Sequence, residues 1–199
     1  FGDVQLTPYI IDYQNPETDR FSYKTEDEEV NQILAAAVHT FEQNAVDLLI
    51  DCPSRERAGW LSDSWFSSVS ELLFTGRNRV EEAFLQNYAL CNTDGLPEGM
   101  IPMCYPADLY DNLYIPNWAM WYVYEIVKYA KIYGKNQTVM DAFARVEGIV
   151  RYFDSKLNEY GLLENLESWI FVEWSAANNA DRVCGVNIPS NICWAACLM

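Results

Sequence analysis

Apolar residues recur along most of the chain at the three- and four-residue spacing that is typical of amphipathic α-helices. This spacing predicts a helix over residues 26–50, and a second apolar periodic segment runs from Trp65 to Phe74 before Gly76. Further helices are predicted over residues 78–91, 117–134, 137–158 and 189–199. The helix at 117–134 is apolar on most faces, so we expect it to be buried on more than one side. Since no strand alternation interrupts this order, the sequence predicts an all-α fold.

The first helix has a recognisable start. Thr25 and Glu28 stand three residues apart, as the two members of a capping box do. The acidic residues of this first turn also suit the positive end of the helix dipole. We therefore expect Thr25 to be the N-cap.

The order of helices and long loops predicts helical hairpins laid side by side, whose loops gather at one end, where a pocket can form. A plain bundle with short loops is the alternative. Residues 1–24 carry prolines among apolar residues and are predicted to be a short strand or an extended linker that enters from a preceding domain. Residues 25–199 would form the N-terminal portion of a helical domain. The last predicted helix has no capping residue after it, so we expect the fold to continue past Met199.

Composition and charge restrict the class of ligand. Half of the 199 residues are apolar and 15% are aromatic, which indicates a globular domain with a substantial core. The formal charge of −16 argues against nucleic acid and against an anionic membrane surface as partners. A neutral ligand such as a sugar or a peptide fits better. The sequence has no apolar run of about 18 residues and no signal peptide.

The six cysteines do not indicate a metal site. None stands in a CxxC pair, and His39 is the one histidine of the sequence, so a zinc site is disfavoured and no metal or cofactor is expected. A lone histidine inside a helix is more often structural than catalytic. Cys193 and Cys197 lie one helical turn apart in an apolar run and are interpreted as buried free thiols.

The long segment 92–116, with four prolines and two glycines, is a candidate functional loop. Its carboxylates could accept hydrogen bonds from sugar hydroxyls, and its rings could stack on sugar faces. A solvated acidic loop is an equally good interpretation. The candidate residues are Asp94, Glu98, Tyr105, Asp108, Tyr110, Asp111 and Tyr114.

The densest chemistry lies between Asp51 and Asp63. Glu56 stands between Arg55 and Arg57 and four residues before Trp60. Neighbouring arginines lower the pKa of a carboxyl group, whereas an apolar wall raises it. If the wall dominates, Glu56 could stay protonated and act as a general acid. An Arg–Glu network that fixes the loop is the other interpretation, and the local sequence slightly favours it.

This stretch, Asp51-Cys52-Pro53-Ser54-Arg55-Glu56-Arg57-Ala58-Gly59-Trp60-Leu61-Ser62-Asp63, resembles the signature of the alpha-L-rhamnosidases of glycoside hydrolase family 78. Weaker similarity extends from about residue 25 to the end and includes Asn117-Trp118-Ala119 and Glu173-Trp174. The resemblance implies part of an (α/α)6 barrel of six helical hairpins. It also implies inverting hydrolysis that releases terminal alpha-L-rhamnose from oligosaccharides or glycosides, and it needs no cofactor or metal, although some relatives bind calcium.

The resemblance also implies roles for single residues. Glu56 matches the general acid, and Arg57 and Asp63 match the remaining polar positions of the signature. The residues expected to bind substrate are Asp51, Arg55, Trp60, Asp63, Trp118 and Trp174. The chain departs from the usual signature, because one acid is missing between Arg55 and Glu56 and Ser62 replaces a glycine. The departures leave open a six-hairpin glycosidase for another sugar, or a catalytically silent carbohydrate-binding relative.

The general base is expected beyond Met199. Asp108, Asp111 and Glu173 are the local carboxylates that could replace it, and they are less favoured. A secreted or periplasmic location is a further expectation from the resemblance. The oligomeric state is not determined by the sequence.

Overall fold

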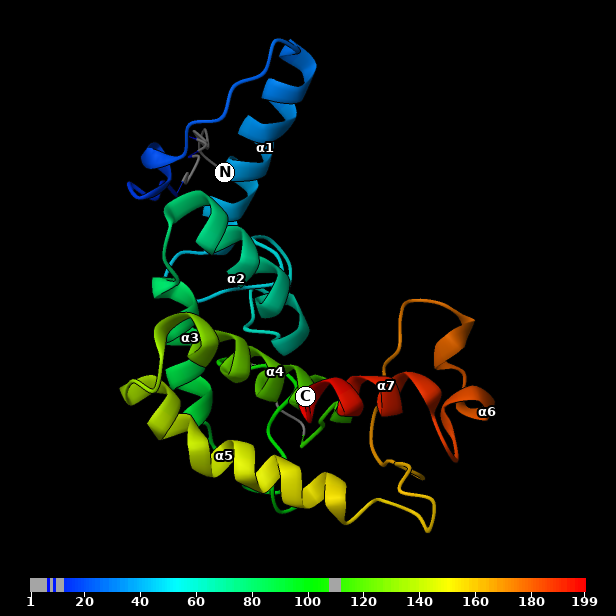
Figure 1. Ribbon diagram of the computed structural model, residues 1–199. Coiled ribbons are helices and arrows are strands. Elements are labelled where there is room, and N and C mark those ends of the chain that lie inside the picture. Colours follow the sequence, from blue (N-terminus) through cyan, green and yellow to red (C-terminus); the bar gives the residue numbers. More distant parts are fainter. Residues whose placement is uncertain (1–6, 8, 10–12, 108–111) are drawn as a thin grey trace, which may run out of the picture.

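The computed structural model describes residues 7, 9, 13–107 and 112–199, and within them every regular element is a helix. Extended pairing among these residues is limited to isolated bridges, such as that between Trp60 and Cys104. The prediction of an all-α fold is therefore confirmed (Figure 1). The elements are η1 (Thr18–Arg20), α1 (Glu28–Asn44), α2 (Leu61–Thr75), α3 (Arg79–Ala89), α4 (Pro116–Tyr133), α5 (Gln137–Asp154), η2 (Ala176–Asn178), α6 (Ala180–Val183) and α7 (Ile188–Cys197).

The long helices form two adjacent rows. α4 contacts α2 on one side and α7 on the other, and α3 contacts α5 in the second row. Each of the pairs α2–α3 and α4–α5 is also in contact, so consecutive helices form hairpins that lie side by side. In Figure 1 the chain follows an open arc from α1 at the top to α5 at the bottom, which fits a piece of a hairpin array better than a closed bundle.

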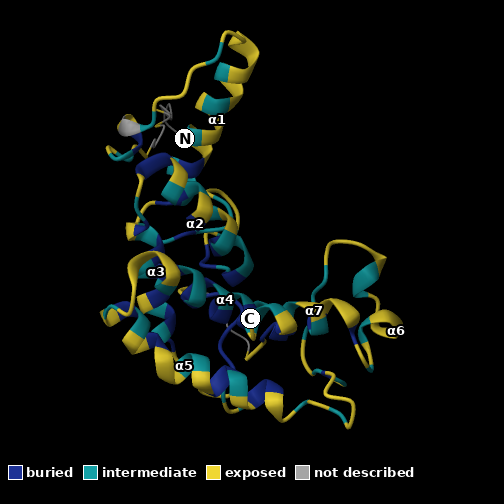
Figure 2. Cartoon of the chain, in the orientation of Figure 1, coloured by how far each residue is buried: buried dark blue, intermediate teal, exposed yellow. Residues whose placement is uncertain are grey.

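The helix α4 lies at the centre of this array. It starts with Pro116 at its first position, where the missing N–H costs nothing, and the N–H of Gly134 closes its last turn on the carbonyl of Ala130. Half of its residues are buried, on faces toward α2, α5 and α7, as the apolar pattern predicts. Each large apolar side chain buried in this way contributes roughly 1.5–3 kcal/mol. By contrast, α1 buries only Phe41 and extends away from the other helices (Figure 2).

The start of α1 differs from the prediction. The N-cap is Asp27, whose carboxylate accepts the backbone N–H groups of Glu29 (2.9 Å) and Val30 (3.4 Å). Thr25 is not the cap, and its backbone N–H donates instead to the side chain of Asn31 (2.8 Å). The helix starts two residues later than a Thr25 cap requires, so Asp27 is the side chain within reach of the unpaired N–H groups.

The end of α1 was also predicted too late. The helix stops at Asn44, and residues 45–50 form a turn in which Ala45 pairs with Leu49 and the N–H of Ile50 donates to the carbonyl of Asn44 (2.9 Å). Ala45 and Leu49 are both buried, so the apolar spacing continues although the helix does not. The charged stretch therefore follows a turn. The same overshoot affects α5, which ends at Asp154.

The described part of the N-terminal segment packs on the helices. It contains the single turn η1 and no strand among residues 13–24. Phe21 meets Phe74 of α2 edge to face, with ring centroids 5.1 Å apart, and Thr18 Oγ1 donates to Glu42 of α1 (2.5 Å). The proposed domain boundary at residue 24 stays a prediction. None of the described helices combines the length and apolar character needed to cross a membrane.

Two carboxyl groups, those of Glu81 and Glu125, lie buried between α2, α3 and α4 beside the partly buried Lys128. Lys128 Nζ is 2.6 Å from Glu81 Oε1, and Ser64 Oγ donates to Glu125 Oε2 (2.7 Å). Glu81 and Glu125 are both fully buried, so two carboxyl groups share one ammonium group away from water. Burial raises the pKa of Glu125 well above its usual value, and the neighbouring Glu81 acts in the same direction. Burial therefore favours the neutral form of Glu125.

We expect Glu125→Gln to make the free energy of unfolding fall less steeply as the pH rises. Above about pH 4.5 the unfolded chain releases the Glu125 proton, whereas the folded chain retains it. The free energy of unfolding of the unmodified protein therefore falls by up to about 1.4 kcal/mol per pH unit on account of this group. Glutamine mimics the neutral carboxyl and removes that slope. Urea unfolding at pH 4.5 and 7 checks this.

The control for this prediction is Glu147→Gln. Glu147 forms an exposed pair with Arg151 on the surface of α5 (3.0 Å), so its replacement should leave the pH slope unchanged. Equal slopes for the Glu125→Gln variant and the unmodified protein would contradict a neutral Glu125.

Candidate active site

The candidate site lies at the N-terminal ends of α2 and α4. Trp60 is the N-cap residue of α2, and Trp118 stands in the first turn of α4. Their rings meet edge to face, with centroids 5.1 Å apart. Both pack on a small buried cluster of Ala58, Met103, Cys104 and Ile115, which joins the loop before α2 to the segment before α4.

A shallow hollow of about 130 Å³ opens above this cluster. It is smaller than the roughly 300–1,000 Å³ of drug-sized ligand sites, so it suits one small ring. All seven residues that the sequence predicts for catalysis or substrate binding line it, together with two others. The lining residues are Asp51, Arg55, Glu56, Trp60, Asp63, Trp118, Trp169, Phe171 and Trp174.

The loop from Asp51 to Gly59, here called the signature loop, is closed by two hydrogen bonds between Asp51 and Ala58. The backbone N–H of Asp51 donates to the carbonyl of Ala58 (3.2 Å), and the N–H of Ala58 donates to Asp51 Oδ1 (3.1 Å). Arg57 takes a left-handed backbone conformation (φ +53°), which non-glycine residues rarely adopt. Its side chain lines a separate hollow with Val46 and Pro53, so Arg57 is not among the residues around the site.

Gly59 fixes this loop against the segment before α4. Its carbonyl accepts both the N–H of Tyr105 (3.0 Å) and the hydroxyl of Tyr88 (2.8 Å). A Cβ atom at residue 59 would overlap the carbonyl oxygen of Tyr105 and press on the ring of Phe84. Only glycine therefore permits this approach of the two backbones.

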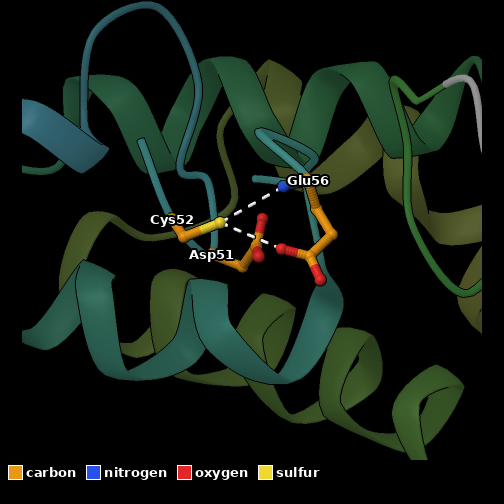
Figure 3. Close-up of side chains that lie close together, drawn as sticks. All are labelled: Asp51, Cys52 and Glu56. Carbon is orange, nitrogen blue, oxygen red and sulfur yellow. Dashed lines mark hydrogen bonds between the residues drawn. The ribbon is translucent and has the colours of Figure 1, made fainter. Parts of the chain in front are cut away.

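Glu56 is an ionised carboxylate in this arrangement. Arg55 Nε lies 2.6 Å from Glu56 Oε2, and the thiol of Cys52 donates to the same oxygen (3.0 Å; Figure 3). These two hydrogen bonds, that of Arg55 first, lower the pKa of Glu56 to about 2. Of the two influences that the sequence left open, the arginine therefore outweighs the apolar wall. The Arg55 side chain is 82% exposed, so the pair lies at the surface.

Asp63 shows the opposite shift. It lies in the first turn of α2 and is partly buried, and this burial raises the pKa of its carboxyl to about 6. The negative charges of Asp51 and Glu56 add to the effect. The hollow thus holds two carboxyl groups with pKa values far apart, an arrangement found where one group exchanges protons and another stays charged.

Asp51, Cys52 and Glu56 also place possible metal-ligand atoms within 4.8 Å of one another (Figure 3). Arg55 already compensates the charge of Glu56 at this position, so we assign no metal to the three residues.

The thiols of Cys193 and Cys197 in α7 form no disulfide and are only partly buried, which corrects the expectation of buried thiols.

The long loop 92–116 contributes none of its described acids to the hollow. Asp94 and Glu98 are exposed and lie elsewhere. Tyr114 turns inward, where its hydroxyl lies 3.3 Å from that of Tyr152, and Tyr105 packs beside Tyr88. Asp108, Tyr110 and Asp111 lie outside the described residues. Glu173 is exposed, bonded to Ser175 Oγ, and does not line the hollow either.

Two residues of the hollow were not predicted as site residues. Trp169 and Phe171 complete an aromatic wall, in which Phe171 meets Trp118, Trp169 and Trp174 edge to face at 5.5, 5.5 and 5.0 Å between ring centroids. In the sequence, the three aromatic residues Trp169, Phe171 and Trp174 lie within six positions, which could have indicated an aromatic part of the site. Trp174 is 83% exposed and forms the rim of the wall.

Larger hollows elsewhere lack this combination of groups. One of about 400 Å³ lies between the N-terminal segment, α2 and α3. Four acidic residues line it, Glu17, Glu42, Asp47 and Glu71, but Tyr13 is its one aromatic lining residue, so it has no aromatic wall. We therefore place the candidate chemistry in the smaller hollow at the signature.

Comparison with known proteins identifies the family of this chain. The model of the bacterial alpha-L-rhamnosidase six-hairpin glycosidase domain matches residues 18–198. The chain belongs to this family. The crystal structure of a GH78 family rhamnosidase of Bacillus sp. GL1 superposes with a TM-score of 0.76 at 20% sequence identity, over 89% of this chain. This chain spans 18% of the length of that rhamnosidase. No curated protein matches it.

We expect Gly59→Ala to damage both the stability of the six-hairpin domain and the site. The added methyl group must push the signature loop away from Tyr105, which costs about 1–3 kcal/mol. Urea unfolding measures that cost, and the catalytic assay described below should show a loss of activity.

The matched control is Gly161→Ala. Gly161 has a left-handed backbone (φ +72°) with open space around it, so alanine should cost about 1–2 kcal/mol in backbone strain alone. Activity should persist in this variant under native conditions. A Gly59→Ala protein as active as the Gly161→Ala protein would show that the approach to Tyr105 does not position the site.

Proposed function

We propose that the full-length protein is an inverting glycosidase that releases terminal alpha-L-rhamnose from oligosaccharides or glycosides. The observation that carries this proposal is the hollow itself, in which three carboxyl groups of the rhamnosidase-like signature face an aromatic wall. Carboxylates accept hydrogen bonds from sugar hydroxyls, and flat rings cover the less polar face and the methyl group of a deoxy sugar.

In this proposal Glu56 is the general acid that protonates the glycosidic oxygen. It must gain a proton first, because its pKa lies at about 2 while Arg55 is paired with it. A sugar that fills the hollow would remove water from Glu56 and displace the exposed Arg55 side chain toward a sugar hydroxyl. Both changes raise the pKa of the carboxyl group. Membership of a glycosidase family supports this role.

The other lining residues bind and orient the sugar in this proposal. Asp51 is held by Ala58 and presents a fixed carboxylate to the hydroxyls. Asp63, protonated below about pH 6, can donate or accept a hydrogen bond. Trp60, Trp118 and Trp174 form the apolar wall together with the two newly found rings.

Inversion also requires a general base across the sugar ring, roughly 6.5–9.5 Å from the acid, with room for a water molecule. Of the described residues, the carboxyl groups around the hollow are Asp51, Glu56 and Asp63, which come from the signature loop and the first turn of α2. We propose that the base lies outside residues 1–199. The secreted or periplasmic location also stays a prediction.

Glu56→Gln should abolish hydrolysis of an alkyl alpha-L-rhamnoside by the full-length protein, because departure of an alkyl leaving group depends on its protonation. Loss of a general acid lowers the rate by about 10²–10⁴-fold. The fold should persist, because Glu56 lies at the surface of the loop. Glu98→Gln, at an exposed residue away from the hollow, is the control and should keep full activity. A Glu56→Gln variant with normal turnover would remove Glu56 from the mechanism.

Asp63→Asn should remove an ionisation from the pH profile. The pH dependence of kcat/KM reports groups of the free enzyme, and the carboxyl of Asp63 titrates near pH 6. We therefore expect a change of slope near pH 6 in the unmodified enzyme that is absent from the Asp63→Asn variant. If the variant keeps the change of slope, another group is responsible for it.

Two alternatives rest on specific observations. The acid missing between Arg55 and Glu56 favours a related six-hairpin glycosidase for another sugar, which a panel of nitrophenyl glycosides would identify. The low pKa of Glu56 favours a catalytically silent carbohydrate-binding relative. Calorimetry that detects sugar binding without turnover would support the silent relative, and turnover of any glycoside would exclude it.

A further inference from the structure

We propose that Cys52 is a positioning residue that fixes the orientation of Glu56. Its side chain forms two hydrogen bonds with Glu56. The thiol donates to Glu56 Oε2 (3.0 Å), and Cys52 Sγ accepts the backbone N–H of Glu56 (3.3 Å; Figure 3). The inference rests on the proposed role of Glu56 as the general acid. It assigns a role to Cys52, for which the sequence predicted none.

The structure distinguishes Cys52 from Arg55, the other partner of Glu56. The Arg55 side chain is 82% exposed and can leave, whereas Cys52 is partly buried. Cys52 also follows Asp51, whose backbone and side chain are both bonded to Ala58, and it precedes Pro53, whose ring restricts the backbone. Cys52 is therefore the fixed partner of Glu56, and Arg55 is the mobile one.

Both side-chain hydrogen bonds reach the same carboxyl oxygen of Glu56. Because Arg55 Nε and the Cys52 thiol occupy Oε2, the proton of the acid form belongs on Oε1. When a sugar displaces Arg55, the bond from Cys52 remains and keeps the carboxyl group in the same orientation. A general acid loses about 10²-fold in rate when it is misplaced by 1 Å, so such a tether has a kinetic effect.

The charged and titratable groups that face Glu56 define the expected pH effect. They are Arg55, Cys52 and Asp51 on the loop and Asp63 on α2. The hydrogen bond from Cys52 stabilises the carboxylate and lowers the pKa of Glu56. Its removal should therefore raise that pKa and shift the alkaline limb of kcat, which reports groups of the enzyme–substrate complex, to higher pH by roughly 0.5–1 pH unit.

The first test compares Cys52→Ala and Cys52→Ser in the full-length protein on two rhamnosides. A nitrophenyl leaving group needs little protonation, whereas an alkyl or sugar leaving group depends on the acid. Cys52→Ala should lower kcat on the alkyl rhamnoside by on the order of 10–100-fold and on the nitrophenyl rhamnoside far less. Cys52→Ser, which keeps a hydroxyl donor, should restore much of the loss and of the pH profile.

Cys184→Ser is the matched control, because this thiol is exposed and distant from the hollow. It should leave both rates and the pH profile unchanged. Equal losses on the two leaving groups with an unshifted alkaline limb in Cys52→Ala would overturn the inference, since a merely structural role has that result. Should Cys52→Ala fail to fold, Cys52→Ser is compared with Cys52→Val by the same two measurements.

A second readout is independent of activity. A thiol that is held in a hydrogen bond to a carboxylate (3.0 Å) reacts more slowly with iodoacetamide than a thiol without that bond. In the full-length Glu56→Gln variant, alkylation of Cys52 should therefore accelerate several-fold while that of Cys184 stays constant, as measured by mass spectrometry. An unchanged Cys52 rate would overturn the contact. If the protein hydrolyses no glycoside but Cys52 alkylation accelerates, the proposed function fails and the Cys52–Glu56 contact stands.

Discussion

The site depends on the close approach of the Gly59 backbone to that of Tyr105. The carbonyl of Gly59 accepts hydrogen bonds from Tyr105 and Tyr88, so the end of the signature loop is attached to the segment before α4. Trp60 follows immediately and begins α2, and this attachment sets its ring against Trp118. One contact without space for a Cβ atom therefore determines how the charged loop, two helix N-termini and the aromatic wall lie relative to one another.

The same loop gives its carboxyl groups opposite properties. Glu56 accepts hydrogen bonds from Arg55 and Cys52, which lower its pKa and keep it ionised. Asp63 is partly buried in the first turn of α2, and this burial raises its pKa to about 6. A sugar entering the hollow would change the first environment more than the second, because the Arg55 side chain is 82% exposed and Asp63 is already partly buried. In the proposed mechanism, the structure shows Glu56 oriented and ionised, and binding of a sugar would supply the desolvation that its protonation requires.

The helices were predictable wherever burial and helical geometry coincide. The bounds of α3, α4 and α7 differ from the predicted ones by one or two residues. The prediction failed at the end of α1, because Ala45 and Leu49 are buried by a turn that continues the helical spacing. It failed again at the cap, where Thr25 and Asp27 both suit an N-terminus and the position of the first helical turn decided for Asp27. Periodicity records which residues are buried, but it does not record the backbone conformation that buries them.

The sequence by itself determined the helical hairpins and the signature from Asp51 to Asp63, and resemblance indicated all seven predicted residues around the hollow. These features are local, because helical spacing and a contiguous motif can be recognised without knowing which segments meet. The tertiary structure alone decided that Trp169 and Phe171 join the wall, that Tyr105 and Tyr114 turn inward, and that Cys52 and Arg55 hold Glu56 ionised. Trp169 and Phe171 lie more than 50 residues along the chain from Trp118, and the pKa of Glu56 depends on distances of about 3 Å that side-chain orientation sets. Spacing along the sequence contains neither quantity.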